Sequence, residues 1–141
     1  MRWEDCVERG TARKDRPDFQ RAKSLFSMAE ARLDVIKEIE MDDESASVIF
    51  TMTYESILEF AHALAALKGY KILDHICIKA FLEDIGIRSI AAKFDIYRKN
   101  RNSINYYGKK LDRKYVEISL REMNNVIEML KNEYVKLGES H

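Results

Sequence analysis

The segment that decides the fold runs from Glu44 to Leu67 and reads ESASVIFTMTYESILEFAHALAAL. It is the most apolar part of the chain, and Gly69 follows it as a stop signal. Its apolar side chains recur at helical spacing and form one stripe, which Tyr54, Leu58 and Ala65 widen; the stripe consists of Ile49, Met52, Ile57, Phe60, Ala61 and Leu64. We therefore expect a helix at the centre of the hydrophobic core.

Four further segments show helical spacing of apolar residues. They run from Pro17 to about Ile36, from Leu73 to about Gly86, from Ile87 to about Gly108, and from about Asp112 to Leu137. No segment has the alternating pattern of a strand. The sequence predicts an all-α, up-and-down bundle of four to five helices over residues 17–138. Residues 1–16 form a poorly patterned N-terminal arm, which is either docked through Trp3 or loose.

Composition excludes several classes of protein. The chain has 141 residues, 46% of them hydrophobic, and no net charge, which is typical of one globular domain. No segment is long and apolar enough for a signal peptide or a membrane span, so we expect a cytoplasmic protein without membrane contact. Cys6 and Cys77 lack the spacing of metal ligands, and two free thiols are the expectation.

Neither a metal nor a cofactor is expected. Glu59 and His62 have the Glu-x-x-His spacing of one half of a di-metal site in a helical bundle, but no second copy exists. A glycine-rich phosphate loop is also missing, which gives no support to ATPase or dinucleotide chemistry.

The stretch RKNRNSINYYG, from Arg98 to Gly108, contains the candidate functional residues. On a helix of about 3.6 residues per turn, Arg101 continues the core-facing side of Phe94 and Tyr97. An arginine there keeps its charge, so it either emerges at the end of the bundle or meets a partner. The candidate partners are Glu55 and Glu59. The functional alternative is a cleft in which Arg101 and Asn105 face a phosphate or ribose.

Two segments of this sequence resemble the HEPN family (higher eukaryotes and prokaryotes nucleotide-binding). They are R-N-x-x-x-Y-Y-G at positions 101–108 and YESILEFAHALAALKGYKILDH at positions 54–75, and the resemblance covers residues 18–137. It implies an up-and-down helical bundle that dimerises. It also implies either a metal-independent ribonuclease with an Arg-x(4–6)-His motif or an inactive relative that binds nucleotide, RNA or protein. Members are often encoded beside a minimal nucleotidyltransferase as a toxin–antitoxin pair.

Carried onto this chain, the resemblance makes Arg101 the motif arginine and Asn102 the polar residue after it. The motif histidine is absent, because Tyr106, Tyr107 and Gly108 occupy its permitted positions. A phenol is almost wholly protonated near pH 7, so Tyr106 is at best a weak general base. His62 and His75 are weak substitutes, since nothing in the sequence places them near Arg101. The expected ligand-binding residues are Arg101, Asn102, Asn105, Tyr106, Tyr107, Lys109 and Lys110.

Three functions remain open at this point. The first is a HEPN-like module that binds nucleotide or RNA without efficient catalysis, with a minimal nucleotidyltransferase as its possible partner. The alternative is a metal-independent ribonuclease toxin in which Arg101 and Tyr106 act. The second alternative is a module that binds only a partner protein. A homodimer is expected in which Ile96 and Tyr107, on the outer side of their helix, form the contact between chains.

Overall fold

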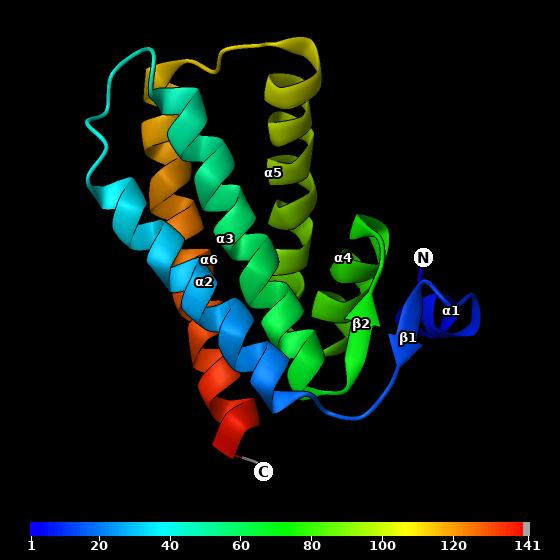
Figure 1. Cartoon of the computed structure of the whole chain (residues 1–141). Coiled ribbons are helices and arrows are strands. Elements are labelled where there is room, and N and C mark those ends of the chain that lie inside the picture. The colour runs from blue at the N-terminus through cyan, green and yellow to red at the C-terminus, as the bar shows by residue number, and fades with distance from the viewer. Residues whose placement is uncertain (140–141) are drawn as a thin grey trace.

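The computed structural model describes residues 1–139, which form six helices and one two-stranded antiparallel sheet (Figure 1). In chain order the elements are α1 (Trp3–Glu8), β1 (Ala12–Lys14), α2 (Phe19–Lys37), α3 (Ala46–Leu67), β2 (Tyr70–Ile72), α4 (His75–Asp84), α5 (Arg88–Tyr107) and α6 (Arg113–Glu139).

Four long helices, α2, α3, α5 and α6, run alternately up and down and form the main body (Figure 1). Helix α3 lies in the middle and packs against the other three. Ile57, Phe60 and Leu64 of its predicted stripe are almost fully buried, whereas Met52 is only partly buried. The predicted all-α bundle is confirmed. Within residues 1–139, no helix is long and apolar enough to cross a membrane.

Side-chain hydrogen bonds and a glycine mark the ends of several helices. Asp18 precedes α2, and its carboxylate accepts a hydrogen bond from the backbone N–H of Arg21 at 2.9 Å. Asp42 caps the turn before α3, where its Oδ1 accepts a hydrogen bond from the backbone N–H of Ser45 at 2.7 Å. Gly108 ends α5 in the left-handed conformation, at φ 63°, as its sequence position predicts.

The N-terminal arm is structured and docked. Trp3 on α1 is 9% exposed and packs edge-on against Tyr70 and Phe81. Strand β1 pairs antiparallel with β2, so that Ala12 lies opposite Ile72. The expectation that the chain has no strands was wrong here. Strands of three residues are too short for their side chains to show an alternating pattern.

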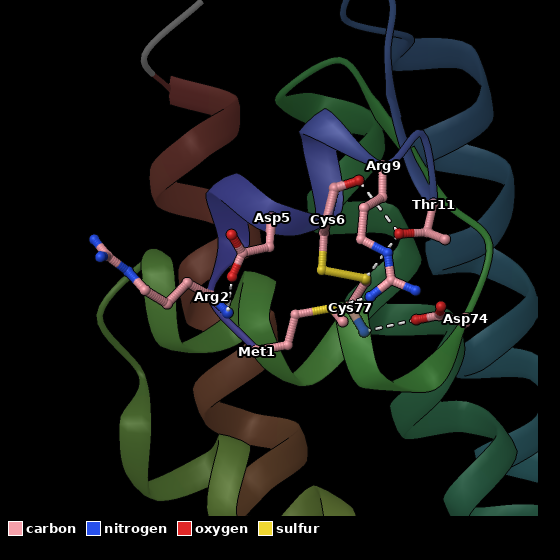
Figure 2. The surroundings of a disulfide bond; sticks show 8 residues. All are labelled: Met1, Arg2, Asp5, Cys6, Arg9, Thr11, Asp74 and Cys77. Atoms are coloured by element: carbon pink, nitrogen blue, oxygen red, sulfur yellow. Dashed lines mark hydrogen bonds between the residues drawn. A yellow bond between two sulfur atoms is a disulfide. The ribbon is translucent and has the colours of Figure 1, made fainter.

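A disulfide joins Cys6 of α1 to Cys77 of α4, so the expectation of two free thiols was wrong (Figure 2). The two cysteines are 71 positions apart in the sequence, and only the folding of the arm onto α4 brings them together. Thr11 lies beside them, with its Oγ1 3.2 Å from the carbonyl oxygen of Cys6. The bond removes the free-thiol argument for a cytoplasmic protein, since disulfides persist mainly in oxidising compartments.

Candidate functional site

Arg101 points from α5 toward α3, and its side chain is only 20% exposed. Its Nε lies 3.7 Å from Oε1 of Glu55, and its guanidinium carbon lies 5.0 Å from the centre of the Tyr54 ring. The ion pair and the cation–π contact hold the guanidinium at the wall of the core. Nε is nevertheless buried without a hydrogen-bond acceptor among residues 1–139.

Glu59, the other candidate partner of Arg101, has a different contact. Its carboxylate meets the guanidinium of Arg32 on α2. Glu59 lies on nearly the same face of α3 as Glu55 but about 6 Å further along the helix axis, where Arg32 of α2 is its partner. Only Glu55 therefore forms the ion pair with Arg101.

A pocket of about 300 Å³ adjoins Arg101. Its wall comes from α3, from the end of β2, from the start of α4 and from Arg101 itself; the polar lining residues are Tyr54, His62, Asp74, His75 and Arg101. Leu58, Ile72, Leu73 and Ile78 supply its apolar surface. The fold thus brings His62 and His75 to the pocket that Arg101 lines.

The two histidines are in different environments. Burial lowers the pKa of His62 to about 4, with a further contribution from the positive charge of Arg21. Its Nδ1 is buried and has no hydrogen-bond partner in the described part of the chain. His75 is exposed, and partial desolvation followed by the charge of Arg98 lowers its pKa. Both imidazoles are therefore neutral at pH 7, and the accessible one, His75, can accept a proton.

The remaining expected ligand-binding residues do not line this pocket. Asn102 is half-buried and Asn105 is exposed on α5. Tyr106 and Tyr107 are 70% and 78% exposed at the end of that helix. Lys109 and Lys110 follow in the α5–α6 connection, where Lys110 pairs with Glu44 at 2.7 Å. The expected set therefore divides into the Arg101 pocket and an exposed aromatic and basic end of the bundle.

Sequence reasoning missed Tyr54 and Asp74 as site residues and placed neither histidine. The only signal in the sequence was the pair Asp74-His75, at the end of the segment 54–75 that resembles the HEPN family. Asp74 caps α4, with its Oδ1 accepting from the backbone N–H of Cys77 at 2.8 Å, and this fixes the start of the helix on which His75 lies.

No cluster of three or more His, Cys, Asp or Glu side chains that could hold a metal occurs within residues 1–139. Comparison of the chain with models of protein families, with curated proteins and with solved structures finds no match in any of the three. The assignment of a function therefore depends on the residues of the site.

Proposed function

We propose that this chain is a HEPN-like helical module that binds the phosphate of a nucleotide or of RNA at Arg101, without efficient catalysis. The observation that carries the proposal is the position of Arg101. Its guanidinium is held by Glu55 and Tyr54 at the wall of a pocket, and its Nε donor is left without an acceptor. Buried donors are seldom left unpaired without a functional reason.

The chemistry of a guanidinium suits this ligand. It presents five N–H donors in a planar fork, and phosphate oxygens match that geometry. Glu55 engages only one side of the fork, at 3.7 Å, and it fixes the orientation of Arg101 before any ligand arrives. The pocket volume of about 300 Å³ is at the small end for ligand sites, and it suits a phosphate with its ribose.

The exposed end of α5 lies beyond this pocket. Tyr106 comes five residues after Arg101, about 7.5 Å along the helix axis and about 140° around it, so its ring lies on a different side of α5. Its ring and that of Tyr107 are open to solvent and offer faces on which bases stack. Lys109 is exposed beside them. An RNA strand bound at Arg101 would reach these residues with its next nucleotides, whereas a mononucleotide would not.

One observation favours a second candidate function, a metal-independent ribonuclease. His75 lines the pocket of Arg101 and is neutral at pH 7. In that reaction His75 would take the proton of the ribose 2′-hydroxyl, whose oxygen attacks the phosphorus while the bond to the 5′-oxygen breaks. Arg101 would stabilise the charge on the phosphate, and the leaving 5′-oxygen would take a proton from water. The products are a 2′,3′-cyclic phosphate and a 5′-hydroxyl end.

Binding is tested by fluorescence anisotropy with a 5′-labelled single-stranded RNA. We expect Arg101→Gln to weaken binding by about tenfold or more, because a charge-assisted contact to phosphate is lost. The matched control is Lys99→Gln on the same helix, whose side chain is 70% exposed, and it should have a much smaller effect. Equal affinity of the wild-type and Arg101→Gln proteins, both shown by circular dichroism to be folded, would exclude the Arg101 site.

Catalysis is tested with the same RNA in the presence of EDTA. If the chain is only a binding module, the RNA stays intact. Cleavage that disappears in His75→Ala and persists in His62→Ala would instead establish the ribonuclease. If the protein binds neither RNA nor nucleotide, the remaining function is that of a module that binds only a partner protein.

The homodimer and the nucleotidyltransferase-type partner also belong to this proposal, whereas the Cys6–Cys77 disulfide speaks against the cytoplasmic location. Ile96 and Tyr107 are 55% and 78% exposed, and they share one face of α5 at a spacing of eleven residues. Their exposure supports a contact between two copies of the chain. Light scattering should give the mass of a dimer for the native protein and that of a monomer for Ile96→Glu; a monomeric native protein would exclude the dimer.

A further inference from the structure

A second pocket, of about 410 Å³, lies beneath the N-terminal arm. It is bounded by α1, β1 and β2 and by the ends of α3, α4 and α6, and it shares no lining residue with the Arg101 pocket. Its volume is in the usual range for small-molecule sites. Aromatic side chains line its wall, and charged side chains lie at its rim.

The wall of this pocket contains three aromatic rings. Trp3 contacts Tyr70 at 5.0 Å and Phe81 at 5.3 Å between ring centres, in both cases edge to face. Leu67 and Leu137 add aliphatic surface. Phe81 is only 1% exposed, so Trp3, at 9%, and the half-buried Tyr70 are the rings that a planar aromatic guest can contact.

The rim carries an excess of positive charge. Lys14 and Lys68 are both exposed, and neither forms an ion pair with the side chains of residues 1–138. Asp84 is the only acidic side chain among the lining residues that the structure describes. Two ammonium groups against one carboxylate leave a net charge of +1 for a guest to balance. We propose that this pocket binds a small aromatic carboxylate, with its ring against Trp3 and its carboxylate near Lys14 and Lys68.

The disulfide helps to build this pocket. Trp3 lies three residues before Cys6 on α1, and Phe81 lies four residues after Cys77 on α4. Residues three and four apart share one side of a helix, so the bond between the cysteines holds the two aromatic side chains together. Figure 2 shows the bond crossing directly from α1 to α4. The N-terminal arm, with α1 and β1, is thereby fixed as one wall of the pocket.

The site contains its own probe, because Trp3 is the only tryptophan of the chain. Phenylacetate is titrated into the full chain while the emission of Trp3 is recorded, at an excitation wavelength that phenyl rings do not absorb. Phenylacetamide and phenethylamine serve as neutral and cationic ligands of nearly the same shape. We expect a saturable change with phenylacetate and an affinity about fivefold lower for phenethylamine, since exposed ion pairs are worth up to about 1 kcal/mol.

Three variants complete the test. Lys14→Gln combined with Lys68→Gln should reduce the affinity for phenylacetate to that for phenylacetamide. Lys71→Gln, which changes an exposed β2 lysine outside the pocket, should leave it unchanged. Cys6→Ser combined with Cys77→Ser should lower the affinity for all three ligands by a similar factor. The proposal is overturned by the absence of a saturable change at millimolar phenylacetate, by tighter binding of phenethylamine, or by an equal loss in the Lys71→Gln control.

Discussion

The four-helix bundle of α2, α3, α5 and α6 and the side layer of α1, β1, β2 and α4 are held together by different interactions. The bundle is stabilised by apolar stripes that repeat along each helix, with Phe60 and Leu64 of α3 fully enclosed. The side layer has a sheet of two three-residue strands, a cluster of aromatic rings and one disulfide. A repeated local pattern therefore builds the bundle, whereas a few contacts between distant residues build the side layer.

The strongest test of the bundle removes a ring from its centre. Phe60 is 1% exposed and packs against Phe26 at 5.1 Å between ring centres. We expect Phe60→Ala to lower the free energy of unfolding by about 4 kcal/mol, because the truncation leaves a cavity. Chemical denaturation followed by circular dichroism measures this value. A loss below about 1 kcal/mol would mean that α3 is not the centre of the core.

The matching test of the side layer removes the disulfide. We expect Cys6→Ser combined with Cys77→Ser to lower the free energy of unfolding by about 3 kcal/mol, since the bond closes a long loop. Hydrogen exchange should then show faster exchange in α1 and β1 while α3 and α6 stay protected. Uniform loss of protection in all helices would contradict the division into two differently stabilised regions.

His62 gives the bundle a dependence on pH. Its pKa is 6.5 in the unfolded chain and about 4 in the native protein, so the unfolded chain binds the proton more tightly. His62 therefore does not lower the free energy of unfolding above pH 6.5, and that free energy falls as the pH drops toward 4. By pH 4.5 the loss should reach about 2 to 3 kcal/mol, since one pKa unit corresponds to about 1.4 kcal/mol. Denaturation midpoints of the wild type and of His62→Gln across this range check it, and parallel pH profiles would contradict it.

Gly69 lies between α3 of the bundle and β2 of the side layer, so its substitution tests the boundary of the two regions. Its φ is +86°, and a Cβ at this position would lie 2.6 Å from the backbone oxygen of Asp15. Gly108 also has a positive φ, +63°, but has open space around it. We expect Gly69→Ala to cost about 2 kcal/mol of unfolding free energy and Gly108→Ala about 1 kcal/mol. Thermal denaturation compares them, and equal losses would show that the contact with Asp15 relaxes without cost.

The sequence predicts the bundle well and the side layer poorly, for a physical reason. The stripe of α5 predicted burial of Phe94 and Tyr97, which are 1% and 3% exposed. Leu73, where the helix that ends near Gly86 was expected to begin, is exposed and precedes α4, which begins at His75. The pairing of β1 with β2 and the disulfide depend on residues about 60 to 70 positions apart, and no local pattern encodes such a contact.

The candidate site shows the same division. Helical periodicity placed Arg101 on the core side of α5 and named Glu55 as a candidate partner, and the two form an ion pair. Periodicity could not place His75, because its position depends on how β2 and α4 follow α3. It also grouped Tyr106 with Arg101 as neighbours along one helix, although their side chains lie in different environments.

The central claim, that Arg101 is a phosphate-binding group, is tested most directly by nuclear magnetic resonance. The protein labelled with ¹⁵N is titrated with AMP, and the Nε–H signal of Arg101 is followed. This proton is buried, which favours its detection. The account predicts a saturable shift of this signal, together with shifts of the His75 imidazole. Signals of Arg101 and His75 that stay unchanged at millimolar AMP would contradict it.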